Sequence, residues 1–259
     1  MNKIKIIGLA LVALLVCQST YAQSNKEYKI SMSSGKLIVK ELDEVEFIGY
    51  SGNEVQITNL DLDQEASDRA EGLRLINGLG LEDNTGIGLS VTKEGNNTVI
   101  NQIARNGGGE FKIKVPKGVI IVYEHSSVHG SDVMFRDIEN EIEVTTNHND
   151  VRLENVTGPM TVNTVHGDIE GVFKSVNQSN PISIVSSHGD IDLGIPASTK
   201  ANLKINTVWG EIYSDLDIAI EKTDDMKRYG ANKVRGSING GGVSFTVESA
   251  HGSIYLRKK

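Results

Sequence analysis

The chain has 259 residues, with 26 basic and 34 acidic side chains and a formal net charge of −8. This acidic balance makes a nucleic acid a poor partner, because binding to phosphates depends on Lys and Arg. Aromatic residues make up only 5%, Gly is frequent at 27 residues and Pro is rare at 4, which favours a thin aliphatic β-structure with many tight corners over a bulky globular core.

Residues 1–22 have the features of a secretory signal peptide. Two lysines precede an apolar run from Ile6 to Cys17, and the stretch from Thr20 to Ala22 predicts cleavage before Gln23. The run of 12 apolar residues is too short to span a bilayer. We therefore expect an exported protein, located in the periplasm, on the outer cell surface or in the medium. After signal removal it would have no transmembrane span and a net charge of −10.

Cys17 offers an alternative processing route, because a cysteine after an apolar run can become lipid-anchored. Val16 precedes it, where a bacterial lipidation site usually has Gly, Ala or Ser, so ordinary signal cleavage is the preferred interpretation. Cys17 is the only cysteine, which leaves the mature chain without a disulfide.

Residues 23–259 are expected to form one β-solenoid domain. Irregular first coils are predicted over 28–115, where short β-branched runs alternate with glycines, and regular repeats over 119–259. Two insertions, each a loop or short helix, interrupt the pattern at Asp61–Gly88 and Asp215–Lys233. The apolar side chains of the first insertion (Leu73, Leu75, Ile76 and Leu79) are expected to pack it back on the body.

A short phrase repeats through the regular region with a period near 20 residues, which is typical of a repeat architecture. One copy reads Val162-Asn-Thr-Val-His166-Gly-Asp-Ile169, and later copies contain His188, Trp209 and His251. Looser copies contain His129 and His148. Val or Ile four residues before the ring, and Ser or Thr two residues before it, alternate as in a strand with one buried face. Val234 to Gly240 are expected to restore the register before the last coil.

Each repeat is therefore predicted to be a strand, a sharp corner and a second strand. Stacking pairs each strand with its equivalent one coil on, at about 4.8 Å, so that the Ser/Thr positions form an internal hydroxyl ladder. The glycines at the corner are expected to supply a backbone conformation that other residues adopt at a cost. The predicted structural corner residues are His129, His148, His166, Gly167, Asp168, His188, Gly189, Asp190, Trp209, Gly210, His251 and Gly252.

The order of several short motifs resembles a known group of secreted proteins, the β-strand-repeat "putative adhesin" family, a domain of unknown function similar to autotransporter head domains. The motifs are Ala70–Leu73 with Glu82–Gly86, Val115–Gly118, the repeated His-Gly-Asp-Ile, Arg235–Gly242 and the closing Gly252–Leu256. The resemblance implies a single-stranded parallel β-helix, right-handed, on a cell-envelope protein of Gram-negative type. It brings no catalytic residues.

The column of histidines allows two interpretations. Imidazoles on adjacent coils could share a zinc ion, but Trp209 in the same column indicates that the corner requires a flat ring. We therefore predict stacked neutral rings, no metal and no cofactor. His125, which we align with the Val or Ile position of later coils, is interpreted as a core histidine with a hydrogen-bond partner.

The acidic column beside the rings (Asp132, Asp150, Asp168, Asp190 and Glu211) raises the alternative of a polysaccharide-active enzyme that uses corner carboxylates. Asp is also favoured at turns for backbone hydrogen bonding, and no basic residue accompanies the column in register. The sequence therefore predicts a non-enzymatic β-solenoid that acts as an envelope scaffold or adhesin-like binding module. Its expected partner is a repetitive envelope glycan or a surface protein.

Overall fold

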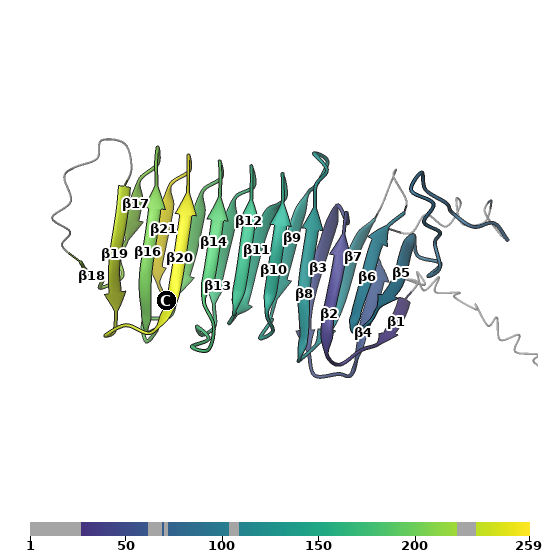
Figure 1. Ribbon diagram of the computed structural model, residues 1–259, viewed down its shortest axis with the longest axis horizontal. Coiled ribbons are helices and arrows are strands. Elements are labelled where there is room, and N and C mark those ends of the chain that lie inside the picture. The colour runs from purple at the N-terminus through teal and green to yellow at the C-terminus, as the bar shows by residue number, and fades with distance from the viewer. Residues whose placement is uncertain (1–26, 62–68, 70–71, 104–108, 222–231) are drawn as a thin grey trace, which may run out of the picture.

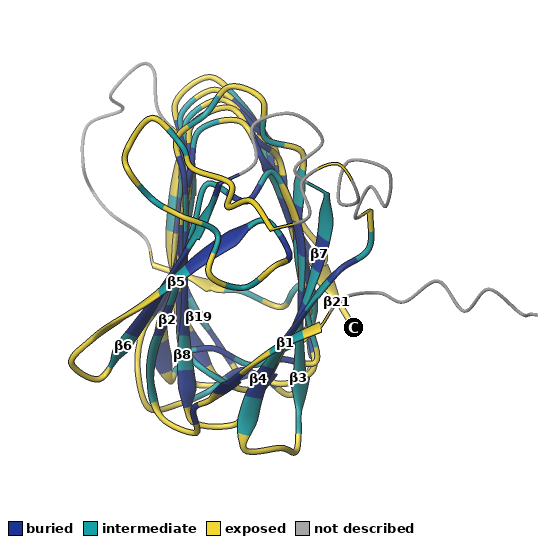
Figure 2. Ribbon diagram, turned by 90° about the vertical axis from the view of Figure 1, so that its right-hand side faces the viewer, coloured by how far each residue is buried: buried dark blue, intermediate teal, exposed yellow. Residues whose placement is uncertain are grey.

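The computed structural model describes residues 27–61, 69, 72–103, 109–221 and 232–259, which form a long stack of β-strands (Figure 1). The expected signal peptide and Cys17 lie outside these residues. Within the described ranges the chain forms 21 strands in two mixed sheets. Seen from one end, the sheets are opposite walls joined by loops (Figure 2). The all-β solenoid-like architecture expected from the repeats is therefore present.

One sheet has ten strands. In spatial order they are β1 (Glu27–Ser31), β4 (Glu54–Asn59), β7 (Glu110–Pro116), β3 (Glu44–Tyr50), β9 (Asp132–Arg136), β11 (Asp150–Val156), β13 (Ile169–Phe173), β15 (Ile191–Ile195), β21 (Ile254–Lys258) and β17 (Ile212–Ser214).

The other sheet has eleven strands. In spatial order they are β18 (Ala219–Ile220), β19 (Asn232–Ile238), β16 (Ala201–Thr207), β20 (Val243–Ser249), β14 (Ile182–Ser186), β12 (Met160–Thr164), β10 (Ile142–Thr146), β8 (Val119–His125), β2 (Gly35–Lys40), β6 (Asn97–Gln102) and β5 (Leu89–Glu94).

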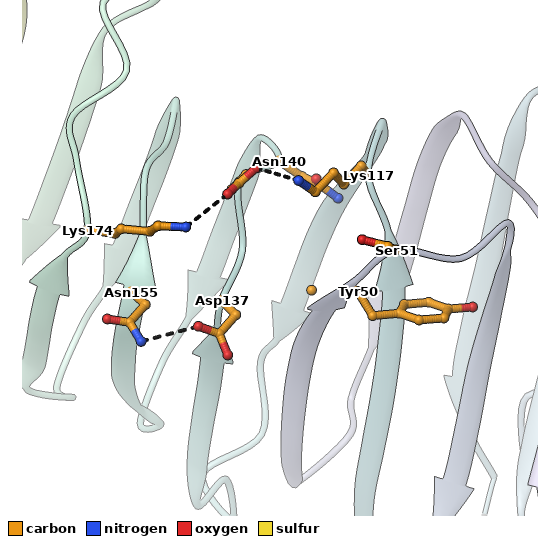
Figure 3. Close-up of a pocket in the computed structure, with 9 residues that line it drawn as sticks. Tyr50, Ser51, Lys117, Asp137, Asn140, Asn155 and Lys174 are labelled. Atoms are coloured by element: carbon orange, nitrogen blue, oxygen red, sulfur yellow. Dashed lines mark hydrogen bonds and ion pairs between the residues drawn. The ribbon is translucent and has the colours of Figure 1, made fainter.

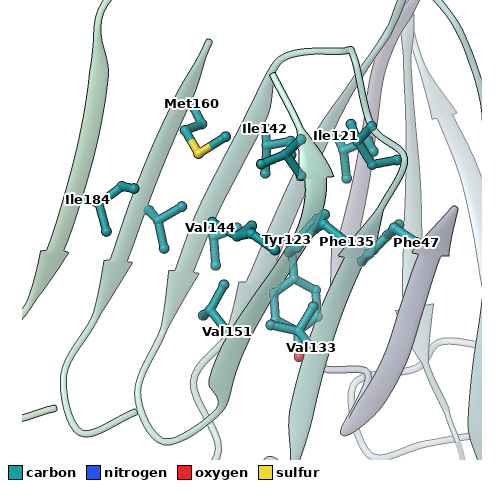
Figure 4. Close-up of a cluster of buried hydrophobic side chains, with 14 of the residues drawn as sticks. Phe47, Ile121, Tyr123, Val133, Phe135, Ile142, Val144, Val151, Met160 and Ile184 are labelled. Carbon is teal, nitrogen blue, oxygen red and sulfur yellow. The ribbon is translucent and has the colours of Figure 1, made fainter. Parts of the chain in front are cut away.

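Alternation along each strand builds the core between the two sheets. In β12 and β13 every second residue is buried and the residues between are exposed, because successive side chains of a strand point to opposite faces. Parallel register then places like residues side by side: Val144 lies opposite Val162, and Val162 lies opposite Ile184. The same buried layer contains the rings of Phe47, Tyr123 and Phe135 (Figure 4).

The spatial order of coils differs from the chain order at two places. The segment β20–β21 lies between β14–β15 and β16–β17, so Ile184 pairs with Val247, and Val247 pairs with Ile205. The segment β2–β3 similarly lies between β6–β7 and β8–β9. We call these segments the C-terminal and N-terminal inserted coils. The prediction that Trp209's coil directly follows that of His188 is therefore wrong. The coils of His188, His251 and Trp209 carry the same columns, so Val247 pairs in register with Ile184 on one side and with Ile205 on the other.

Antiparallel strands close both sheets at the N-terminal end of the stack and the eleven-stranded sheet at the other end, where the ten-stranded sheet ends in β17, parallel to β21. At one end β19 pairs antiparallel with β16, and at the other end β5 pairs with β6 and β4 pairs with β7. The prediction that Val234 to Gly240 continue the parallel register is wrong, because β19 reverses direction. At the end near β16 the edge strands β18 and β17 have only two and three residues, which limits further edge-to-edge pairing.

The described part of the first insertion projects from the stack as an ordered hairpin. The side chain of Asn77 accepts hydrogen bonds from the backbone N–H groups of Leu79 and Leu81, at 2.9 and 3.0 Å. Leu73 and Leu79 are 74% and 84% exposed, and Leu75 and Ile76 are exposed as well. The prediction that these side chains pack on the body is therefore wrong.

Candidate functional site

The principal candidate surface is the corner that joins β10, β12, β14, β20 and β16 to β11, β13, β15, β21 and β17. Each turn here is held by a buried hydroxyl. Ser186 Oγ accepts a hydrogen bond from Gly189 N at 2.8 Å and donates to the carbonyl oxygen of Gly167 at 3.1 Å, one coil away. The same pair of bonds recurs at Ser249 and at Thr207. The hydroxyl ladder therefore links coils and fixes the turn.

The corner glycines are required by close approach of the neighbouring coil. They have no positive φ, so the conformational reason expected from the sequence is wrong. A Cβ would lie 1.9 to 2.1 Å from a carbonyl oxygen of the adjacent turn, for Gly167 that of Asn149, for Gly189 that of Gly167, for Gly252 that of Gly189 and for Gly210 that of Gly252. Only a residue without a side chain lets successive turns stack at this distance.

Five aromatic rings form one exposed stack along the corner. The centroids of His148 and His166, and of His166 and His188, are 4.7 Å apart, and those of His188 and His251 are 4.6 Å apart. Trp209 stacks on His251 at 6.4 Å and is 75% exposed. The stack therefore continues through the C-terminal inserted coil, and its outer edge faces solvent.

His129 lies apart from the stack. It is exposed, and the structure, which describes the whole turn from Ser126 to Ser131, gives it no ring contact with His148. The register of β8 explains this: Tyr123 lies opposite Val144 and His125 lies opposite Thr146. The sequence alignment of this first copy was wrong by two residues, because the turn after β8 is longer than the later turns.

The electrostatics of the stack favour neutral rings. Desolvation lowers the pKa of His166 below its ordinary value of 6.5, and charges on His148 and His188 would lower it further. Because stacked rings are nearly parallel, their nitrogen lone pairs do not converge on one point, as a tetrahedral zinc ion requires. Among the described residues, no group of three His, Cys, Asp or Glu side chains is arranged to hold a metal ion.

The acidic column beside the rings forms a second ladder between coils. Asp150 Oδ1 accepts a hydrogen bond from Asp168 N at 2.8 Å, Asp168 Oδ1 accepts from Asp190 N at 2.8 Å, and Asp190 Oδ1 accepts from Ser253 N at 2.7 Å. In the next coil Ser253 Oγ accepts from Glu211 N at 3.2 Å. Asp150, Asp168 and Asp190 thus each satisfy a backbone donor one coil away rather than in their own turn. Asp132 instead pairs with Arg152 at 3.2 Å, so the expectation that no basic residue accompanies the column is wrong at this position.

The residues that precede each ring complete an uncharged strip. We call the five stacked rings together with these residues (Asn147, Val165, Ser187, Ala250 and Val208) the corner band. Val165 and Val208 are both more than a third exposed. None of the band's side chains carries a formal charge when the histidines are neutral, so it offers ring edges, amide, hydroxyl and aliphatic groups to a ligand.

A buried polar network joins the N-terminal inserted coil to its neighbours. His125 is buried, and its Nε2 lies 3.0 Å from Asp43 Oδ1, so its interpretation as a core histidine with a partner holds. Tyr123 donates a hydrogen bond to the carbonyl oxygen of Leu42 at 2.7 Å, and Asn149 donates to Tyr123 Oη at 3.1 Å. Burial, together with nearby Asp43, raises the pKa of Tyr123 far above its ordinary value.

The opposite corner of the stack contains a cleft of about 320 Å³ that the sequence did not reveal (Figure 3). On its rim, Lys117 and Lys174 donate to the two carboxylate oxygens of Glu139 at 2.9 and 3.2 Å. Beside them, Asn155 Nδ2 donates to Asp137 Oδ1 at 3.2 Å, and both of these residues are exposed. Hydrogen bonds from both lysines hold the pKa of Glu139 below its ordinary value. We call this feature the Asp137 cleft.

Residues 23–257 match the family model described as Toastrack DUF4097. The chain belongs to the Toastrack DUF4097 family. The family membership expected from the order of the short motifs is therefore confirmed.

Two solved structures resemble this Toastrack chain. One is a "putative cell adhesion protein" from Clostridium sporogenes, 12% identical, with a TM-score of 0.49, covering 91% of this chain and 100% of the other. The second is a "putative adhesin" from Bacteroides fragilis, 10% identical, with a TM-score of 0.32, covering 92% and 98%. No curated protein matches the chain. In the part of the chain that the structure describes, we find no helix with the length and apolar character that a membrane crossing requires.

The Asp137 cleft of this Toastrack chain carries no periodic sequence signal. Its walls come from the turns that follow β7, β9 and β13, from the end of β11 and from the end of β3, which lies between β7 and β9 as part of the N-terminal inserted coil. The turn at Lys117 was recognised as the entry to the regular region, but nothing in the repeat predicts that it faces Tyr50 and Lys174.

Proposed function

We propose that this Toastrack chain is an exported, non-enzymatic binding module of the cell envelope, adhesin-like or scaffolding in role. The observation that carries the proposal is the corner band. Four imidazoles and one indole stand in register on an exposed edge, and the imidazole nitrogens of the four stacked histidines make no hydrogen bond or ion pair with other described residues.

The periodicity of the band suits a repetitive partner. Equivalent groups recur at every coil, so a chain with its own repeat can make the same contact several times, and weak contacts then add to useful avidity. Rings with an apolar face and a polar edge suit surfaces that are partly wet. A repetitive envelope glycan is therefore the first candidate ligand, and a surface protein is the second.

The geometry gives less support to the alternative of a polysaccharide-active enzyme. A glycosidase needs one carboxyl group that donates a proton and another that acts as base or nucleophile across the scissile bond. In the corner column one oxygen each of Asp150, Asp168 and Asp190 is engaged by a backbone N–H of the next coil. This arrangement supports a structural role for the carboxylates.

A glycan array run beside a hydrolysis assay tests the proposal. We expect binding without turnover, and we expect Trp209→Ala to weaken it roughly tenfold, as removal of an exposed anchor ring does. Tyr213→Ala is the matched control, because Tyr213 is another exposed aromatic residue but lies in β17, on the face of the ten-stranded sheet.

Two results would contradict the proposal. Turnover that is lost in Asp168→Asn and Asp190→Asn would establish the enzyme instead. Equal glycan binding by the wild type and by Trp209→Ala would show that the corner band is not the binding surface. The export step is tested separately: mass spectrometry of the mature N-terminus should give Gln23 as the first residue, whereas an acylated Cys17 would establish a lipid anchor.

A further inference from the structure

The Asp137 cleft lies at the corner opposite the band and is built differently. We propose that it is a second binding site, which takes one sugar unit of a neutral saccharide. For its class of ligand this inference rests on the proposed function, but it concerns other residues. The volume of about 320 Å³ is at the lower end of the range for small-molecule sites, which fits a single ring better than a longer chain.

The polar groups of the cleft include both donors and acceptors. Each lysine of the rim, Lys117 and Lys174, donates one hydrogen bond to Glu139 and has ammonium donors left. Asp137 accepts from Asn155 through Oδ1, which leaves its second oxygen and the amide oxygen of Asn155 as acceptors. A sugar hydroxyl both donates and accepts, so neighbouring hydroxyls can engage the ammonium and carboxylate groups together.

The charges of the cleft favour a neutral ligand. Two ammonium groups face two carboxylates, and the lowered pKa of Glu139 keeps that carboxylate ionised at neutral pH. An anionic ligand would gain the lysines but would also approach Asp137 and Glu139, in a molecule whose net charge is already −8. A polyol avoids this repulsion while it uses the same groups.

The backbone of Asp137 and Asn155, which form one wall of the cleft, is tightly constrained. Asp137 and Asn155 both have left-handed backbones, with φ of 56° and 55°, which Asp and Asn adopt more readily than other residues with a side chain. The residues that follow them, Ile138 and Val156, are fully buried in the core. Gly49 approaches the same wall so closely that a Cβ would lie 2.1 Å from the carbonyl oxygen of Asp137. The carboxylate and the amide are thus held in place before a ligand arrives.

The other wall is formed by the end of the N-terminal inserted coil. Figure 3 shows Tyr50 and Ser51 on the side of the cleft opposite Lys174. Tyr50 is held by a hydrogen bond from its hydroxyl to the carbonyl oxygen of Glu54. The Tyr50 ring points away from Asp137 and Asn155 and lies over its own turn at Gly52, so this wall closes the site without adding an aromatic face, and a sugar would be held there by hydrogen bonds.

Titration of the full mature chain with neutral sugars, followed by backbone amide NMR, tests the inference. The probes are glucose, galactose, mannose and N-acetylglucosamine at millimolar concentration, with glucuronate as the charged comparison. We expect at least one neutral sugar to shift the amides of Ser51, Asp137 and Asn155. Asp137→Asn, which keeps the shape and tolerates the left-handed backbone, should weaken this sugar about tenfold. Lys174→Ala should weaken it by a smaller factor.

The matched control is Asp217→Asn, because the Asp217 side chain is 96% exposed and lies between β17 and β18, the edge strands at the other end of the stack. It should leave the titration unchanged, and all variants should melt as the wild type does. Sugar-induced shifts that persist in Asp137→Asn, shifts confined to the corner band, tighter binding of glucuronate, or no shift by any sugar would each overturn the inference.

The two proposals fail in different ways. If Trp209→Ala loses array binding and no sugar shifts the amides of the Asp137 cleft, only the proposal for the cleft is wrong. If a sugar binds the cleft and Trp209→Ala binds the array as the wild type does, only the proposal for the corner band is wrong.

Discussion

The two inserted coils occupy equivalent places near opposite ends of the stack but are held by different means. The C-terminal inserted coil carries the full repeat: Ser249, His251 and Gly252 join the hydroxyl, ring and glycine columns of their neighbours. The N-terminal inserted coil has no such motif and is held by the buried network around Asp43. Backbone pairing with the neighbouring strands is therefore common to both inserted coils. Their corners differ: one uses the side chains of the repeat motif, and the other uses a polar network found only there.

The difference matters for stability because the two corners tolerate different changes. A corner made of columns depends on steric fit between successive turns, so any added atom displaces backbone. A corner made of a polar network depends on every buried donor and acceptor having a partner. The first should be most sensitive to size and the second to loss of a polar group.

The largest effect is expected from Gly252→Ala in the C-terminal inserted coil. The new Cβ would lie 2.1 Å from the carbonyl oxygen of Gly189, which cannot move without disturbing the adjacent turn. We expect the free energy of unfolding to fall by about 3 kcal/mol in urea denaturation. The control is Gly78→Ala, where no atom lies within 4 Å and φ is not positive, so the change should stay within about 0.5 kcal/mol. Equal losses would contradict the steric account.

A smaller effect is expected from Asp43→Ala in the N-terminal inserted coil. It leaves His125 Nε2 without its partner, and His125 Nδ1 has no hydrogen-bond partner among the residues that the structure describes. A buried polar group without a partner costs roughly 1–3 kcal/mol, so we expect a loss of about 2 kcal/mol.

Asp190→Ala provides the comparison for this change. Its carboxylate bonds to Ser253 N at 2.7 Å, but the residue is exposed and water can replace it, so the loss should be below about 1 kcal/mol. If Asp190→Ala costs as much as Asp43→Ala, the contrast between the two corners fails.

The smallest effect is the response of the ring stack to pH. The pKa of His166 is lowered by desolvation and then by His148 and His188, so the unfolded chain binds that proton more readily than the folded protein. The free energy of unfolding should therefore fall as the pH decreases through 6.5, and should be fully retained above it. NMR titration should give His166 a midpoint below 6.5, and His148→Gln should raise it. A wild-type midpoint at or above 6.5 would contradict the stacked arrangement.

The sequence predicted the columns of the fold because the physical signal is local. The alternation at Met160, Val162 and Thr164 indicates which side chains face inward, and repetition of the same phrase indicates that equivalent residues are neighbours. The hydroxyl ladder and the ring stack follow from this pattern alone. The pattern could not give the order of coils, because identical columns make Val247 as good a neighbour of Ile184 as Ile205 would be.

Features that depend on segments without a repeat motif could not be predicted from the sequence for a different reason: no periodic signal shows which of these segments are neighbours. The polar network around Asp43 and the walls of the Asp137 cleft come from segments without a repeat motif. His125 was aligned with the wrong column because its turn differs in length from those of later coils. The reason for the corner glycines was also misjudged, because a close approach between coils leaves no mark on a single repeat.

The placement of β20–β21 between segments that precede it in the chain has a kinetic consequence. Strand β16 borders β20 and β19, and β14 borders β12 and β20, so β16 reaches its final position only when the later segment has arrived between the two. Synthesis from the N-terminus therefore cannot add completed layers one after another. The last coils near this end of the stack are instead completed after β20–β21 has paired with β14–β15 on one side and with β16–β17 on the other.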